Sequence, residues 1–206
     1  MKKAQAKTPF SAKLVNAPPT KPKNREQRQR EYLTDSEVEQ LRKAALRQGR
    51  NGLRDDTLIL LMFRHALRVS EVIALRWEQV DLKKGFLHVT RLKNGLPSTH
   101  PLRGIELRAL RQLQRNDPQN SYVFLSERQT PLTSRTVHNI VAKAGKLAKI
   151  PFTVHPHMLR HSTGFYLANN GHDTRAIQSY LGHANIKNTV IYTQLSSRIF
   201  NKFWID

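Results

Sequence analysis

The sequence predicts a mainly helical protein with one small antiparallel β-sheet, in the α+β class. From residue 33 onward, apolar residues recur at the three- and four-residue spacing of amphipathic helices over most of the chain. Two segments, "GFLHVTRL" and "NGLPSTHPL", instead have the pattern of a strand, a glycine-containing turn and a return strand. We find no internal repeat, and 206 residues suggest one domain or one domain plus a tail.

Three helices are expected before this hairpin. The first follows Leu33, because Thr34 and Glu37 in "TDSEVEQLRKAAL" have the spacing of a capping box. The second, "DDTLILLMFRHAL", is apolar enough to be central. The third, "SEVIALRW", is short.

After the hairpin, a helix is expected over residues 105–115 and a short strand at "SYVFLS". "SRTVHNIVAKAGKLA" should be a helix with Ser134 as its N-cap, and the helix that starts at "HPHMLRH" should stop at Gly171. Three further helical stretches follow: "DTRAIQSYLG", "NTVIYTQL" and "SSRIFNKFWID".

The composition restricts the class of protein. Hydrophobic residues make up 38% of the chain, enough for one core, and no apolar run approaches the roughly 20 residues of a membrane helix. The N-terminal residues lack the apolar region of a secretory signal, so the cytoplasm is the expected location. The absence of cysteine excludes disulfides, thiolate zinc sites and a cysteine nucleophile.

The charge is strongly basic: 35 Lys and Arg against 15 Asp and Glu give a formal net charge of +20. Such an excess favours nucleic acid as the partner over a membrane surface or non-specific basicity. Residues 1–31 hold nine Lys and Arg among few large apolar residues, which predicts a flexible basic arm. The alternative is an unselected leader.

The segment "HPHMLRH" could bind zinc, contact a phosphate or form an inert helix end. His157 and His161 share a helix face, as do His157 and Arg160. The zincin motif needs Glu after its first His, where this chain has Met158. The fixed charge of Arg160 also repels a metal, so phosphate contact is favoured.

Other positions are weak signals when taken singly. Arg68 lies three residues before Glu71, which is either a surface ion pair or an arginine held ready for a phosphate. Lys93 lies in the hairpin turn. In "LGHANIKNTVIYT", His183 precedes Tyr192 by nine residues. Alone, Lys93, His183 and Tyr192 are each more often structural residues.

Together, in this order and spacing, these positions resemble the catalytic domain of the tyrosine site-specific recombinases, the lambda-integrase-like family. "ALRVSE" is similar to the first-arginine box, "HMLRH" to the second box and "LGHANIKNTVIYT" to the third. Lys93 stands eight residues before Pro101, as the family lysine does. The resemblance covers about residues 32–200 and fills six positions: Arg68, Lys93, His157, Arg160, His183 and Tyr192.

A closer resemblance is to the small bacterial recombinases that invert fimbrial promoter elements. It implies a catalytic domain over residues 32–206, preceded by the basic arm at 1–31. Larger members carry an N-terminal core-binding domain before the catalytic pattern, and here only about 30 residues precede it. A full core-binding domain is therefore not expected.

The resemblance implies two transesterifications. Tyr192 attacks a DNA phosphodiester and forms a 3′-phosphotyrosine link, which a 5′-hydroxyl then resolves. Arg68 and Arg160 neutralise the transition state, and His183 adds a hydrogen bond. His157 accepts the tyrosine proton and Lys93 protonates the leaving oxygen. Glu71 holds Arg68, while His161 supports the site through a bond to backbone. His155 matches no motif position, and neither cofactor nor metal is expected.

The expected partner is double-stranded DNA, in a homotetrameric synaptic complex with possible accessory DNA-bending proteins, and no membrane. When free, the chain is expected to be a monomer or weak dimer. The predicted outcome is inversion, integration or excision of a DNA element. Two alternatives are a relaxing enzyme of the type IB topoisomerase kind and a catalytically inactive DNA-binding regulator.

Overall fold

The computed structural model describes residues 30–91 and 96–194. Apart from Arg30, these residues belong to one compact unit that begins at Glu31. Lys93, residues 1–29 of the expected basic arm and the terminal stretch 196–206 lie outside the described residues.

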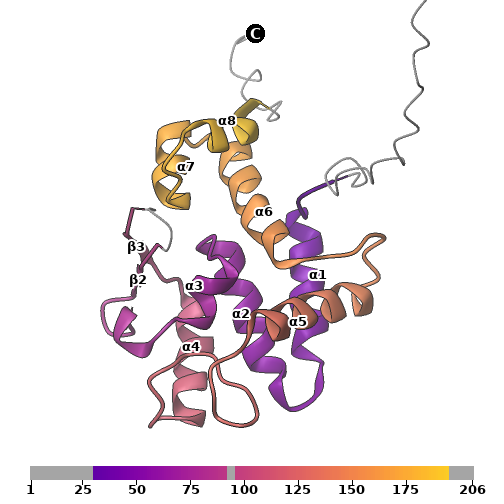
Figure 1. The fold of residues 1–206 in the computed structure, drawn as a ribbon, viewed down its shortest axis with the longest axis vertical. Helices are drawn as coiled ribbons and strands as arrows, with labels where there is room; N and C mark the ends of the chain where they lie inside the picture. The colour runs from indigo at the N-terminus through magenta and orange to yellow at the C-terminus, as the bar shows by residue number, and fades with distance from the viewer. Residues whose placement is uncertain (1–29, 92–95, 195–206) are drawn as a thin grey trace, which may run out of the picture. The chain divides into compact units, whose positions relative to one another are not determined.

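The described chain is mainly helical with one three-stranded antiparallel sheet, which confirms the predicted class (Figure 1). The elements are α1 Asp35–Leu46, η1 Gly49–Asn51, α2 Gly52–Arg64, α3 Val69–Ile73, η2 Trp77–Gln79, β1 Val80–Asp81, β2 Phe86–Val89, β3 Ser98–Pro101, α4 Gly104–Asn116, α5 Ser134–Leu147, α6 Pro156–Asn169, α7 Thr174–Leu181 and α8 Lys187–Gln194.

Helix α2 forms the centre of the fold, as its apolar sequence predicts. Residues 58–62 are almost fully buried, and the helix packs against α1, α4 and α6. Helix α1 begins with the predicted capping box: the hydroxyl of Thr34 accepts from the Glu37 amide, and the Glu37 carboxylate accepts from the Thr34 amide at 2.8 Å. These two bonds satisfy backbone donors that the first turn leaves without helical partners.

The sheet has the order β1-β2-β3, and Leu87 of β2 faces His100 of β3. Along β2, Leu87 and Val89 are buried while Phe86 and His88 are exposed, the alternation of a half-buried strand. The sequence did not predict β1, because two residues are too short for an alternating pattern.

Two local predictions were wrong. "SYVFLS" is not a strand, although Val123 and Phe124 are buried as its apolar residues suggest; only single bridges join Tyr122 to Arg76 and Leu125 to Pro131. The N-cap of α5 is Thr133 rather than Ser134, because it is the Thr133 hydroxyl that accepts from the Thr136 amide, at 3.1 Å.

A small second core stands apart from the main one. It consists of Ala66, Ala168, Ile177, Leu181 and Tyr192. These residues join the turn after α2 to helices α6, α7 and α8. The expected nucleophile therefore belongs to a hydrophobic cluster.

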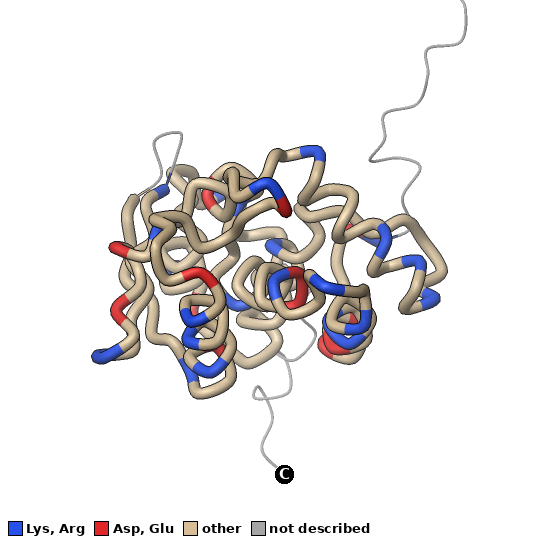
Figure 2. Tube along the Cα trace, turned by 90° about the horizontal axis from the view of Figure 1, so that it is seen from below, with Lys and Arg blue, Asp and Glu red and all other residues tan. Residues whose placement is uncertain are grey.

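The described residues agree with the composition in two respects, their spread of basic charge and the limited apolar length of their helices. Lys and Arg are spread over several of the described helices (Figure 2). None of the helices within residues 30–91 and 96–194 has the length and apolar character needed to cross a membrane.

Candidate active site

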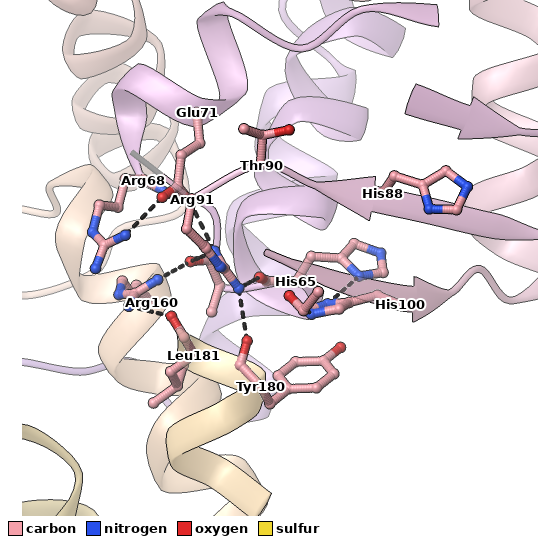
Figure 3. A network of polar contacts seen from close by, with 12 residues as sticks. His65, Arg68, Glu71, His88, Thr90, Arg91, His100, Arg160, Tyr180 and Leu181 are labelled. Carbon is pink, nitrogen blue, oxygen red and sulfur yellow. Dashed lines mark hydrogen bonds and ion pairs between the residues drawn. The ribbon is translucent and has the colours of Figure 1, made fainter. Parts of the chain in front are cut away.

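The site forms where the start of α3, the first turns of α6 and the α7–α8 turn meet. Figure 3 shows the guanidinium groups of Arg68 and Arg160 near each other, although 92 positions of sequence separate them. Helices α7 and α8 both pack against α6, which brings the third sequence box to the second.

Arg160 is buried within this junction, with 2% of its surface exposed. Its guanidinium donates to the carbonyl of Ala66 at 2.5 Å and to that of Leu181 at 2.6 Å. It thereby ties the turn before α3 to the end of α7. Burial, together with the charges of Arg68 and Arg91, lowers the pKa of Arg160 to about 9, so the group is charged at neutral pH.

Ala66 makes this arrangement possible through its backbone. Its φ of 52° is left-handed, a conformation that costs a non-glycine residue roughly 1 kcal/mol. The chain reverses here between α2 and α3, and the Ala66 carbonyl accepts from both Arg160 and Arg91.

Arg68 is the N-cap of α3 and pairs with Glu71. Its Nη1 donates to Glu71 Oε1 at 2.7 Å, and its amide donates to Oε2 at 2.9 Å. The Arg68 side chain remains 29% exposed, whereas that of Glu71 is 2% exposed. Burial alone would raise the pKa of Glu71, but the Arg68 amide and the charges of Arg91 and Arg68 lower it overall. The carboxylate therefore stays ionised and holds Arg68 at the surface.

Tyr192 lies in the second core with 2% of its surface exposed. Its ring covers Gly164, where an added Cβ would lie 2.6 Å from the ring, and meets Phe165 edge-on at 5.2 Å. Its hydroxyl shares a hydrogen bond of 2.9 Å with Nδ1 of His161. Burial raises the pKa of Tyr192 to about 12 against the opposing charge of Arg160, so the phenol is protonated at neutral pH.

Two histidines, His161 and His183, lie beside the Tyr192 ring, and a third, His157, lies beside His161. The ring of His157, at the surface of the first turn of α6, meets that of His161 at 4.5 Å. His183 bonds the hydroxyl of Thr189 through Nδ1 at 2.9 Å and lies parallel to the Tyr192 ring. Desolvation and the charges of Arg160 and Arg68 lower the pKa of His157 and bring that of His183 to about 3. Both rings are therefore neutral at pH 7.

The structure thus brings five of the six predicted positions together, and Lys93 lies outside the described residues. The sequence suggested that His161 supports the site through a bond to backbone, whereas the structure shows its ring bonded directly to the Tyr192 hydroxyl. His155 is the N-cap of α6 and lies 3.9 Å from Glu31. Among the described residues, no His, Asp or Glu side chains gather in a group of three that could hold a metal ion.

Sequence reasoning missed Arg91, whose side chain is fully buried beside Glu71. A signal was present: Arg91 continues, two residues beyond the end of β2, the period of two set by the buried Leu87 and Val89, so residue 91 is expected to point inward.

The fold defines the class of protein first. A crystal structure of XerA recombinase matches with a TM-score of 0.74 at 27% identity, over 85% of this chain and 65% of that one. A lambda integrase dimer bound to a COC′ core site matches with a TM-score of 0.64 at 20% identity, over 85% and 50%. The fold is that of tyrosine recombinase catalytic domains.

Sequence comparison then gives the family. The phage integrase family model matches residues 31–198. "Type 1 fimbriae regulatory protein FimB" of Escherichia coli (strain K12) is 42% identical over 182 residues, which are 86% of this chain and 90% of the relative. "Tyrosine recombinase XerA" of Pyrococcus horikoshii is 35% identical over 170 residues, 81% and 57% respectively. The chain belongs to the phage integrase family of site-specific tyrosine recombinases.

Proposed function

We propose that this recombinase cleaves and rejoins double-stranded DNA with Tyr192 as its nucleophile, and that it inverts, integrates or excises a DNA element. The observation that carries the proposal is the meeting of Arg68, Arg160, His183 and Tyr192 at one junction from three separate parts of the chain. The 42% identity to the fimbriae regulatory protein FimB, over 90% of its length, agrees with the resemblance to the small recombinases that invert fimbrial promoter elements.

The two arginines have different parts in this scheme. Arg68 is partly exposed and held from behind by Glu71, so its guanidinium can meet a phosphate that approaches from solvent. Arg160 is buried and bonded to two carbonyls, and it contributes mainly a fixed positive charge beneath that phosphate. Preorganised charge of this kind stabilises the oxygens of a phosphoryl transition state without reorganisation during the reaction. Lys93, on the hairpin, is proposed as the acid for the leaving 5′-oxygen.

Proton removal from Tyr192 is the task of the neutral histidines. With a phenol pKa near 12, the proton must leave as the oxygen attacks. In the docked position the hydroxyl shares a hydrogen bond with His161, and the ring of His157 packs edge-on against that of His161. We propose that His157 accepts the proton, directly or through water, once the hydroxyl has moved towards the arginines. His183 is proposed to bond the transferring phosphate.

Tyr192 cannot attack DNA from the position described here, because its ring is enclosed by the second core. The reaction therefore requires a movement of α8 that brings the hydroxyl towards the arginines. We propose that residues 32–206 form the catalytic domain, that residues 1–31 add non-specific DNA contacts, and that four copies assemble around two duplexes with possible help from DNA-bending proteins. Free protein is then a monomer or weak dimer.

The deciding experiment compares wild type with Tyr192→Phe on nicked suicide substrates made from candidate sites in the DNA that flanks the coding region. Wild type should form a covalent adduct that denaturing gels detect, while the Phe variant should bind the DNA without an adduct. Recombinant products from a plasmid carrying two sites would establish strand exchange. Relaxed circles alone would indicate a topoisomerase-like enzyme, and binding without any adduct by wild type would indicate a regulator.

A further inference from the structure

We propose that Arg91 is a positioning residue for DNA cleavage, because its buried guanidinium holds Glu71 and the turn before His183 in the arrangement that Arg68 and His183 need. This inference rests on the proposed function and adds a residue that the family motifs do not include.

The two terminal nitrogens of Arg91 make four hydrogen bonds, while its buried Nε has no partner among the described residues. Its side chain has no exposed surface. Nη1 donates to Glu71 Oε2 at 2.9 Å and to the Ala66 carbonyl at 3.3 Å. Nη2 donates to the Tyr180 carbonyl at 2.7 Å and to the His65 carbonyl at 3.2 Å (Figure 3). Arg91 therefore joins the hairpin to the turn before α3 and to the end of α7.

At one end of this network, Glu71 is shared between two arginines. Arg68 bonds one carboxylate oxygen and Arg91 the other. Because Arg91 is fully buried and Arg68 is 29% exposed, only Arg68 can reach DNA. Arg91 balances the buried charge of Glu71 and fixes the rotation of its carboxylate. Without Arg91, that carboxylate would be half-paired in a buried position, and Arg68 would lose its fixed support.

At the other end, Arg91 and Arg160 hold consecutive carbonyls. Arg91 bonds the carbonyl of Tyr180 and Arg160 that of Leu181. Both also bond the carbonyl of Ala66. Arg91 and Arg160 thus both connect the turn after α2 to the end of α7. The second sequence box includes Arg160 but not Arg91.

The turn that leads into His183 lies directly on Arg91. Gly182 has a φ of 64°, and a Cβ there would lie 2.8 Å from Arg91 Nε. The left-handed glycine therefore lets the backbone pass close to the guanidinium. Any displacement of Arg91 would move the residue next to His183, and misplacement of a catalytic group by about 1 Å can cost on the order of 100-fold in rate.

The test uses the full chain with Arg91→Met, Arg91→Lys and a matched control, Arg54→Met. Arg54 is also largely buried and also bonds a carboxylate and a carbonyl, those of Asp55 and Leu125. Each variant is measured for thermal stability, for DNA affinity across salt, and for single-turnover adduct formation at saturating DNA. Adduct formation by wild type, absent in Tyr192→Phe, tests the proposed function separately from the role of Arg91.

Arg91→Met should lower the cleavage rate at saturating DNA by about 100-fold. Its affinity for DNA and the salt slope should stay at the wild-type values, because Arg91 neutralises no phosphate. Arg91→Lys should recover part of the rate, since an ammonium can still pair with Glu71 but cannot reach all four acceptors. Arg54→Met should lose stability and keep its cleavage rate.

A double-mutant cycle with Glu71→Gln decides whether Arg91 acts through Glu71. We expect the double variant to cleave no more slowly than the slower single variant, because both changes remove one coupled unit. If the rate losses of the two single variants multiply in the double variant, the proposal is overturned. It is also overturned by a folded Arg91→Met that cleaves at the wild-type rate or that loses only DNA affinity. If Arg91→Met does not fold, Arg91→Lys takes its place in the cycle under the same criteria.

Discussion

Gly164→Ala should expel Tyr192 from its pocket. Gly164 is on α6, and a Cβ built there lies 2.6 to 2.7 Å from three atoms of the Tyr192 ring. The ring would have to move by roughly 1 Å to reach ordinary contact, and overpacking of this kind costs about 1–3 kcal/mol. Replacing a helical glycine by alanine also stabilises the helix by about 0.5–1 kcal/mol. That gain is present whether Tyr192 is docked or not, so it does not offset the overpacking of the docked state.

The equilibrium between docked and released Tyr192 should therefore shift by about 5- to 150-fold towards release. Fluorine NMR on protein labelled with 3-fluorotyrosine measures this shift, with Tyr192→Phe assigning the resonance among five tyrosines. We expect the buried resonance of Tyr192 to shift, or to lose intensity, towards the position of an exposed tyrosine. Adduct formation should be faster than in wild type, because more molecules have Tyr192 free to reach DNA.

Gly145→Ala is the matched control. It makes the same change within helix α5, and its Cβ would lie 2.7 Å from Val154. It should change the melting temperature by a similar amount and leave the Tyr192 resonance in place. An unchanged resonance in Gly164→Ala would refute the packing of Tyr192 on α6 and, with it, the argument that α8 must move.

Three further predictions concern acid, metal and salt. Burial and the charges of His65 and Arg91 lower the pKa of His100 to about 3. Between about pH 6.5 and pH 3, His100 is therefore protonated in the unfolded chain but neutral in the folded one, which favours unfolding. Stability should fall as the pH drops from 6.5 towards 3, and thermal melts of His100→Gln should show a weaker pH dependence; an equal slope would contradict this. Adduct formation should persist in excess EDTA, because side chains supply the charge; loss that zinc restores would revive a metal role for His157 and His161. Deleting residues 2–31 should weaken all DNA binding and flatten the salt slope by roughly 0.9 for each phosphate that the arm neutralises, whereas an unchanged slope in filter binding would make the arm a passive leader.

Local sequence determined the elements and the candidate chemistry. The capping box at Thr34, the apolar run of α2 and the stop of α6 before Gly171 are each decided by neighbours in the chain, so pattern and spacing predicted them. The spacing of Arg68, Arg160, His183 and Tyr192 indicated the family for the same reason. The prediction at Ser134 missed by one residue, because two adjacent hydroxyl residues have the same capping chemistry.

Only the tertiary structure decided what these side chains contact. "SYVFLS" has the composition of a strand, but within residues 30–91 and 96–194 it forms only the single bridges of Tyr122 to Arg76 and Leu125 to Pro131. Tyr192 is buried against Gly164 and bonded to His161 because α8 packs on α6, a contact between residues about 30 positions apart. Arg91 looks like a hairpin cation in the sequence, yet its four acceptors come from the turn after α2, from α3 and from α7. Burial and hydrogen-bond partners are properties of segments that meet only after folding, and local pattern carries no information about which segments those will be.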